Sequence, residues 1–144
     1  MTNEDTIKML KECNQGIKMA VNSIDEVLPK VHSDRFKKCL EDSKQEHEEL
    51  GNETRRILDQ YGESGKDPSL MAKGMSWIKT NTEMLANPTD NTAADIIVDG
   101  CDMGVKTLYR YKNQYKAADE KARDITDRLI RSEENLSEDL RPFL

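Results

Sequence analysis

The sequence has little of what marks secreted, membrane or nucleic-acid-binding proteins. Its three cysteines, Cys13, Cys39 and Cys101, are odd in number and widely spaced, so neither a disulfide framework nor a zinc knuckle is indicated. No apolar run approaches the roughly 18 residues of a membrane span. The first five residues lack the basic and apolar regions of a signal peptide. We therefore expect a cytoplasmic protein with no membrane partner.

Basic residues are also too few for a nucleic-acid partner. The chain has 22 Lys and Arg against 28 Asp and Glu, which gives a formal net charge of −6. Nucleic acids and anionic surfaces select a basic face, so neither is expected as a partner. A length of 144 residues fits one domain, and 35% hydrophobic with 35% charged residues is typical of a soluble helical protein.

Helical periodicity is the main positive signal in the chain. Apolar residues recur every three or four positions, and strand-type alternation is absent. Proline at 29 ends the first helical pattern, Ser33 is a good N-cap for the second, and Asp67-Pro68 is a typical helix start. The pattern predicts helices at about residues 3–28, 34–61, 68–86 and 91–132.

The longest predicted helix organises the rest. Its small or apolar stripe runs through Ile97, Cys101, Gly104, Leu108, Tyr111, Tyr115, Ala118, Ala122, Ile125 and Leu129. A helix of about 40 residues is on the order of 60 Å long and needs other helices against its stripe. The sequence therefore predicts an all-α fold, a single antiparallel four-helix bundle over residues 1–144 with an extended C-terminal helix. The tail from Leu136 to Leu144 is expected to be a short turn or a frayed end.

The far half of the long helix predicts self-association. About 15 residues would project beyond the shorter helices, and the stripe continues over them. An exposed apolar seam usually marks an interface, which favours a homodimer or another homo-oligomer. The alternative is that the helix breaks near residues 116–119 and folds back, which would bury the seam in one chain. The seam residues are Ala118, Ala122, Ile125 and Leu129.

Three polar residues interrupt the apolar stripes. If the first two helices form a hairpin turning near Val31, Asn14 and His47 lie at about the same height. With a direct turn near Ser64, Asn81 reaches that height as well. We expect a buried hydrogen-bonded layer of Asn14, His47 and Asn81 that fixes helix register, in preference to a ligand site.

A family resemblance rests on two segments and this polar layer. The run from Ala94 to Gly104, following the run from Lys73 to Lys79, resembles the ferritin-like superfamily, and more closely its small bacterial branch of domains of unknown function. The resemblance covers about residues 5–130 and implies a four-helix bundle. Family members with an active di-iron centre carry a Glu on two helices and Glu-x-x-His on the other two.

The sequence departs from that ligand pattern. Lys44 stands three residues before His47, where the family has Glu, and a cation there would repel a metal. Asp95, Asp99 and Asp102 fall roughly opposite the stripe through Ile97, so they are expected to face solvent. The resemblance therefore implies a bundle without retained di-iron ligands, catalytic residues or cofactor. Only His47, Asp99 and Asp102 remain as weak candidates for metal ligands.

Three functions follow, in decreasing order of support. The first is a non-enzymatic structural or protein-interaction module, and the second is a diverged metal-binding or oxidative enzyme. The third is a histidine phosphotransfer domain, which the segment from His47 to Gly51 resembles because a glycine follows the histidine by four residues. That family has an exposed histidine with a lysine nearby, whereas His47 lies on the stripe and Leu50 takes the place of the lysine.

The connection between the second and third predicted helices leaves the topology open. A ferritin-type crossover must span the length of the bundle, on the order of 30 to 40 Å, and residues 62–67 reach only about 20 Å when extended. Either the bundle is simply up-down-up-down, or residues as far as Met71 unwind into the crossover.

Overall fold

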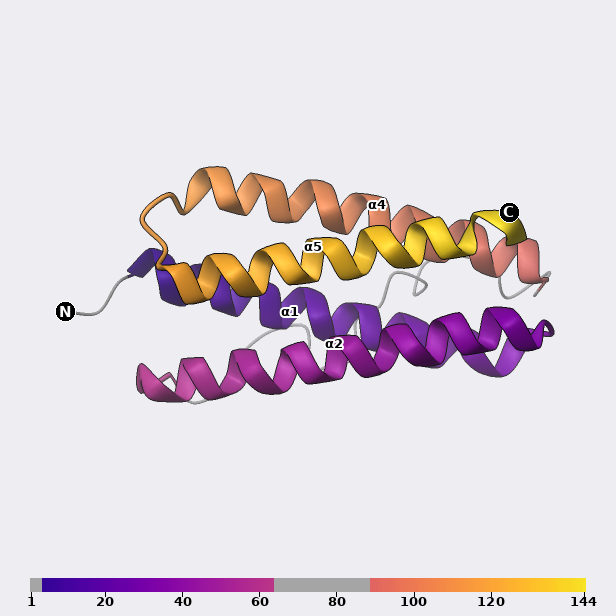
Figure 1. Cartoon of the computed structure of the whole chain (residues 1–144), viewed down its shortest axis with the longest axis horizontal. Helices are drawn as coiled ribbons and strands as arrows, with labels where there is room; N and C mark the ends of the chain where they lie inside the picture. The colour runs from indigo at the N-terminus through magenta and orange to yellow at the C-terminus, as the bar shows by residue number, and fades with distance from the viewer. Residues whose placement is uncertain (1–3, 64–88) are drawn as a thin grey trace.

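The computed structural model describes residues 4–63 and 89–144, and within these ranges the chain is helical with no strand. Helix α1 spans Glu4–Val27, the short 3-10 helix η1 spans Leu28–Lys30, and α2 spans Asp34–Gln60. Helix α4 spans Asp90–Gln114, α5 spans Glu120–Leu140, and the 3-10 helix η3 spans Arg141–Phe143. Figure 1 shows that α1, α2, α4 and α5 extend along a common axis. The helix predicted at 68–86 lies outside the described residues.

Local signals explain the boundaries of α1 and α2. The α1 helix ends at Val27, and η1 contains Pro29, which cannot donate a backbone hydrogen bond. Ser33 caps α2 by accepting a hydrogen bond from the Phe36 N–H at 3.2 Å, as the sequence predicted. The Asp90 carboxylate accepts from the N–H groups of His32 and Ser33 at 2.8 and 2.9 Å. The turn before α2 is therefore tied to the first residue of α4.

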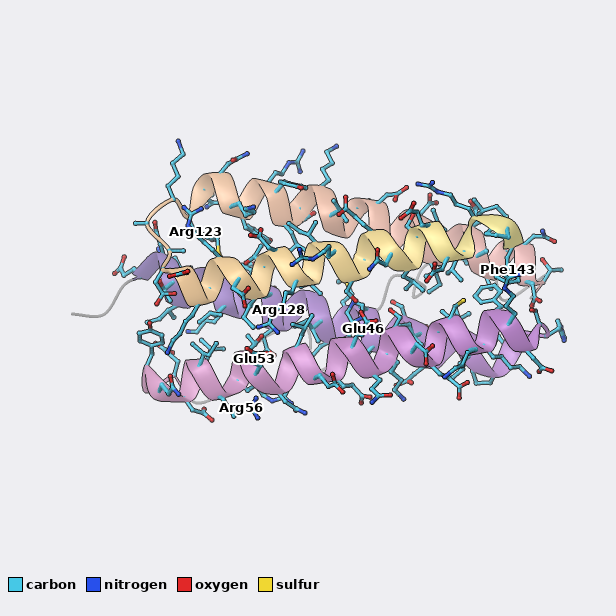
Figure 2. The ribbon with its side chains drawn as sticks, viewed as in Figure 1. Glu46, Glu53, Arg56, Arg123, Arg128 and Phe143 are labelled. Carbon is cyan, nitrogen blue, oxygen red and sulfur yellow. The ribbon has the colours of Figure 1, made fainter. Side chains whose placement is uncertain are left out.

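The single long helix predicted over 91–132 is wrong. The chain leaves α4 after Gln114 and begins α5 at Glu120, so the region contains two helices joined by a short turn. Asp119 caps α5 by accepting from the Ala122 N–H at 3.0 Å. The Arg123 guanidinium, labelled in Figure 2, donates to the Lys116 and Ala118 carbonyl oxygens at 2.6 and 3.1 Å. These bonds satisfy backbone groups that an unbroken helix would have paired internally.

Side chains of α1 hold the same turn in place. The Thr6 hydroxyl accepts from the Asp119 N–H at 2.7 Å, and the Asp5 carboxylate accepts from the Ala117 N–H at 3.0 Å. Both acceptors come from the first turn of α1, more than 100 residues away in the sequence. The break therefore depends on tertiary contacts as well as on the local cap.

The contacts at the two ends of α2 define the path of the chain. Tyr61, just after α2, donates from its hydroxyl to Asp119 at 2.6 Å, so α2 ends beside the start of α5. Asp90, the first residue of α4, binds the turn before α2. Helices α2 and α4 thus run in the same direction, and α1 and α5 run in the opposite direction (Figure 1).

Among the described residues the buried apolar side chains form two clusters, one toward each end of the helices. One contains buried side chains from the first half of α1, the second half of α2 and the first half of α5, among them Met9, Leu10, Ile17, Leu50, Ile125 and Leu129. The other joins the end of α1 to the starts of α2 and α4 and the end of α5, and includes Ile24, Phe36, Leu40, Ile97, Leu136 and Leu140. Between the clusters, α2 and α5 place buried polar residues.

The C-terminal residues are packed, which corrects the expected turn or frayed end at 136–144. Helix α5 continues to Leu140, and both Leu136 and Leu140 are buried because they extend the apolar stripe of the helix. The Phe143 ring stacks on Phe36 with 4.8 Å between centroids, and Figure 2 labels it at this end of the bundle. The Asn91 amide donates to the Phe143 carbonyl at 3.0 Å.

The described helices are amphipathic. On α2 the buried residues Phe36, Leu40, Leu50 and Ile57 recur at helical spacing, and charged residues occupy most of the positions between them. None of the helices in residues 4–63 and 89–144 is long and apolar enough to cross a membrane.

Candidate functional site: a buried histidine–glutamate pair

His47 lies on the buried face of α2 and has no exposed surface. Its Nδ1 is 2.8 Å from the Ser43 carbonyl oxygen and 3.3 Å from the Ser43 hydroxyl. A carbonyl oxygen only accepts hydrogen bonds, so Nδ1 carries the proton. In the neutral ring, Nε2 then has a lone pair and no hydrogen. The helix that carries His47 therefore fixes the tautomer of the ring.

Glu133 faces His47 from α5. Its side chain is only 2% exposed, and its Oε1 lies 4.0 Å from His47 Nε2. Among the described residues, neither Nε2 nor Glu133 Oε2 has a hydrogen-bond partner. Burial raises the pKa of the Glu133 carboxyl above its ordinary value of 4.5, and His47 opposes that rise. The site thus contains two buried polar groups that face each other, each with one atom that has no hydrogen-bond partner among the described residues.

Gly104 makes room for Glu133 on the α4 side. A Cβ placed on Gly104 would overlap Oε2 of the Glu133 carboxyl. Any larger residue at this position would have to displace the carboxyl or separate α4 from α5. Gly104 lies on the stripe predicted for the long helix, and its function there is to admit this side chain.

Burial and the charge of Glu133 raise the pKa of two thiols, Cys13 and Cys101. Burial raises the pKa of Cys13 to about 12, opposed by a hydrogen bond with Thr126 at 3.3 Å. Burial also raises the pKa of Cys101, and the Glu133 and Asp102 charges add to that rise. Both thiols are therefore less readily ionised than an exposed cysteine. All three cysteines are free, with Cys39 only partly buried.

Asn14 does not share a layer with His47, so the predicted layer is wrong on this point. Ile17 packs against Gly51, and Asp25 pairs with Lys44 at 2.7 Å. The α1 position opposite His47 is therefore near residues 21–22, and Asn14 lies on the order of 10 Å away along the axis. The chain continues through η1 and the extended Val31 before it returns, which offsets the two helices.

Asn14 is nevertheless buried, as its place on the stripe predicted. It is 2% exposed, and its Oδ1 has no hydrogen-bond partner among the described residues. Asn81, the third member of the predicted layer, lies outside the described residues. Glu133 is the residue that the structure places beside His47.

The three weak metal candidates are not brought together. His47 is buried, whereas Asp99 and Asp102 are exposed on the outer face of α4, as is Asp95. The Asp102 carboxylate accepts a hydrogen bond from Ser137 at 3.1 Å. In residues 4–63 and 89–144 no group of three His, Cys, Asp or Glu side chains could hold a metal ion.

The four residues predicted as an oligomer seam are buried inside the chain. They belong to the apolar cluster formed with α1 and α2, because the turn at 115–119 folds α5 back along the bundle. The structure shows the alternative arrangement, in which the helix breaks near residues 116–119 and folds back. The prediction of an exposed seam is therefore wrong for all four residues, Ala118, Ala122, Ile125 and Leu129.

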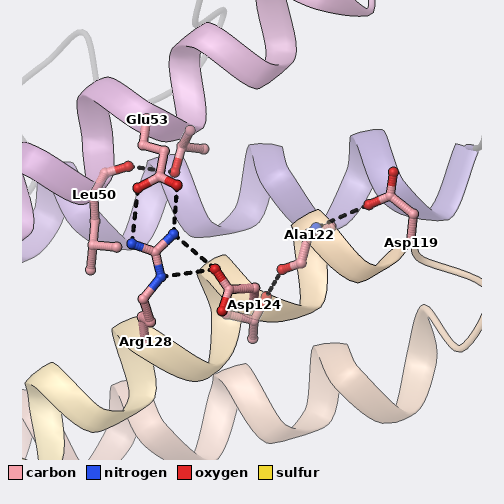
Figure 3. A network of polar contacts seen from close by, with 8 residues as sticks. Leu50, Glu53, Asp119, Ala122, Asp124 and Arg128 are labelled. Atoms are coloured by element: carbon pink, nitrogen blue, oxygen red, sulfur yellow. Dashed lines mark hydrogen bonds and ion pairs between the residues drawn. The ribbon is translucent and has the colours of Figure 1, made fainter.

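A surface network joins the same two helices that carry the buried pair. Figure 3 shows the Arg128 guanidinium between the Glu53 and Asp124 carboxylates. Arg128 donates to the two Glu53 oxygens at 2.6 and 2.9 Å and to Asp124 at 2.9 Å. Farther along, the Ser132 hydroxyl donates to Glu46 at 2.9 Å. These contacts occur in the same α2–α5 register that places Glu133 opposite His47.

Sequence reasoning missed Glu133, although a signal was present. The stripe predicted for the long helix ends at Leu129, and four more residues along the same helix face reach Glu133, followed by the buried Leu136 and Leu140. A lone acidic residue on an apolar stripe, flanked by buried leucines, indicates a buried carboxyl that needs a partner.

Comparisons of the chain with protein-family models, with curated proteins and with solved structures found no match.

Proposed function

We propose that this chain is an antiparallel four-helix bundle of the ferritin-like type that acts as a non-enzymatic structural or protein-interaction module. The path of the chain supports the ferritin-like type. Helices α2 and α4 run in the same direction, because α2 ends beside the start of α5 whereas α4 begins beside the turn before α2. Two successive described helices that run in the same direction fit a ferritin-like fold, whereas the helices of a simple up-down-up-down bundle alternate in direction.

The observation that carries the non-enzymatic function is the way in which the mid-bundle pair is enclosed. Ser43 engages one nitrogen of the His47 ring, and the other faces Glu133. Glu133 in turn packs against Gly104. Lys44, at the position where the family has a Glu, lies near the surface and pairs with Asp25. The pair is thus built as a part of the core.

The burial of His47 also bears on the phosphotransfer alternative. A phosphotransfer histidine must reach a partner protein, and His47 has no exposed surface. The structural or interaction module therefore has the better support of the two.

Metal content tests the proposal. Protein purified from iron-supplemented growth should contain well under one equivalent of iron, manganese or zinc per chain. Its melting temperature should also stay the same when Fe²⁺, Mn²⁺, Zn²⁺ or a chelator is added, because a ligand that binds only the folded state raises that temperature. A stoichiometric bound metal, or a rise in melting temperature that saturates at one equivalent, would contradict the proposal.

Self-association and a cytoplasmic location remain predictions. The seam from which self-association was predicted is buried, so any interface must use another surface. Light scattering on the intact chain measures the mass directly, and a monomer at all concentrations would remove the homo-oligomer from the proposal.

A further inference from the structure

His47 Nε2 and the Glu133 carboxyl are both hydrogen-bond acceptors unless one of them carries a proton. With Nδ1–H donating to Ser43, Nε2 of the neutral His47 ring is an acceptor. An ionised Glu133 presents acceptors only. The unpartnered Nε2 lies 4.0 Å from Glu133 Oε1, and the second carboxyl oxygen, Oε2, has no hydrogen-bond partner among the described residues, so an ionised Glu133 and a neutral His47 ring have no hydrogen to share.

We propose that His47 and Glu133 form a buried binding site for a single proton, which the folded chain retains at neutral pH. One proton makes the pair neutral overall, whether it is on the carboxyl as a carboxylic acid or on Nε2 as an imidazolium facing a carboxylate. Without a proton the pair is a buried anion, and with two protons it is a buried cation. Both charged states are costly away from water. The proton belongs to the pair and not to either residue alone.

Other charges near the pair do not replace the proton. His47 is the one group among the described residues whose charge shifts the pKa of Glu133. From α1 and α4 the nearby titratable groups are Cys13 and Cys101, which stay neutral because burial raises their pKa values. The charged neighbours on α2, α4 and α5 have partners of their own: Lys44 with Asp25, Glu46 with Ser132, and Asp102 with Ser137.

Gly104 supplies a short route to solvent. Its backbone lies against the Glu133 carboxyl and is itself partly exposed. Because this residue has no side chain, one layer of backbone covers the carboxyl on the α4 side. A small separation of α4 from α5 would therefore let the proton exchange without unfolding the bundle.

The proton count predicts how stability depends on pH. An unfolded chain loses its glutamate proton near pH 4.5 and its imidazole proton near pH 6.5. Above about pH 6.5 the unfolded pair holds no proton and the folded pair holds one, so stability falls as pH rises. The folding equilibrium constant then falls by up to about tenfold per pH unit, until the folded pair loses its proton.

The predicted loss of stability at high pH agrees with the raised pKa of Glu133. A carboxyl whose pKa is raised in the folded state contributes stability that is present below the unfolded value and is lost as pH rises through the folded value. Below about pH 4.5 the unfolded pair holds two protons and the folded pair one, so stability falls again in acid. Between about pH 4.5 and 6.5 the pair contributes no pH dependence.

Glu133→Gln tests the proposal, with Glu134→Gln as the matched control. The Gln amide donates to His47 Nε2 without titrating, and residue 134 is the exposed neighbour on the same helix. Urea unfolding from pH 6 to 9 should show that Glu133→Gln lacks a loss of up to about tenfold per pH unit that the wild type and Glu134→Gln share. Equal slopes in all three proteins would overturn the proposal.

A direct proton count keeps the test valid if Glu133→Gln does not fold. Wild-type protein refolded at pH 7.5 in a weakly buffered dye solution should take up close to one proton per chain. No uptake would overturn the proposal. Elemental analysis of the same sample tests the proposed function separately from the shared proton. A bound metal would contradict the non-enzymatic function, whereas the proton count tests only the His47–Glu133 pair.

Discussion

Two acid–base pairs join α2 to α5, and they differ in almost every respect except the helices that carry them. Arg128 and Glu53 form a two-pronged pair with bonds of 2.6 and 2.9 Å, and their side chains are 35% and 37% exposed. His47 and Glu133, about two turns away, are 0% and 2% exposed, and their nearest polar atoms are 4.0 Å apart. Water can reach the first pair and not the second.

The pKa values of Glu53 and Glu133 consequently shift in opposite directions. The hydrogen bond from Arg128 lowers the pKa of Glu53 below its ordinary value. Burial raises the pKa of Glu133, and His47 offsets only part of that effect. The comparison shows that a partner nearby does not by itself keep a carboxyl ionised, because loss of solvent can outweigh it.

The largest effect on stability is expected when one member of the buried pair is removed and the other is kept. His47→Ala leaves Glu133 buried without a partner and opens a cavity, which should lower the free energy of unfolding by about 3–5 kcal/mol at pH 7. Urea denaturation measures the change. Replacing both residues with leucine should recover most of the loss, since an apolar pair has no unmade hydrogen bonds. A loss under about 1 kcal/mol for the single variant would contradict the burial of an unpaired carboxyl.

Gly104→Ala should be the next most damaging change. The new methyl group overlaps the Glu133 carboxyl, and such overpacking costs about 1–3 kcal/mol. Gly16→Ala is the matched control because its Cβ meets no atom within 4 Å, and it should stabilise α1 by about 0.5–1 kcal/mol. Thermal unfolding compares the two variants. In a Glu133→Ala background the cost of Gly104→Ala should largely disappear, and a cost that persists would place the clash elsewhere.

The exposed pair should contribute much less. A double-mutant cycle with Glu53→Ala and Arg128→Ala is expected to give a coupling energy of about 0.2–1 kcal/mol, because solvent screens the charges and the long side chains lose entropy. Adding 1 M salt should weaken that coupling, whereas the effect of His47→Ala should hardly change. A coupling above about 3 kcal/mol would mean that the pair behaves as a buried one.

The smallest expected effect is the contribution of Glu53 to acid sensitivity. Its pKa is lowered in the folded state, so its stabilisation is present above the unfolded value of about 4.5 and is lost as pH falls through the folded value. Glu53→Gln should therefore flatten the acid limb of stability below about pH 4.5, by less than about 1 kcal/mol because the pair is exposed. Glu133→Gln acts on the alkaline side, so an identical effect of both variants would contradict the comparison.

The helices with local end signals could be predicted from the sequence. Pro29 and Ser33 mark the turn before α2, and α1 and α2 begin and end within one residue of their predicted limits. The turn between α4 and α5 contains neither proline nor glycine. Its stability comes partly from Thr6 and Asp5, whose contact with residues 117–119 no local pattern reveals.

The candidate site could be predicted only in part. The place of His47 on an apolar stripe showed that it is buried, but its partner depends on how the helices are offset. A symmetric hairpin placed Asn14 at its level, whereas η1 shifts the register of α1 against α2. The residue opposite His47 is Glu133, which comes from α5. Register between helices is set by side-chain packing such as Ile17 against Gly51, which helical periodicity does not specify.

The nitrogen NMR spectrum of the His47 ring tests the buried pair most directly. At pH 7 the wild type should show a protonated Nδ1 that exchanges slowly with solvent, because Ser43 holds it and the ring is fully buried. In Glu133→Gln, Nε2 should show the shift of an unprotonated nitrogen that accepts a hydrogen bond. A ring with its proton on Nε2 and none on Nδ1, or one that exchanges rapidly with solvent in the folded protein, would contradict the enclosed pair.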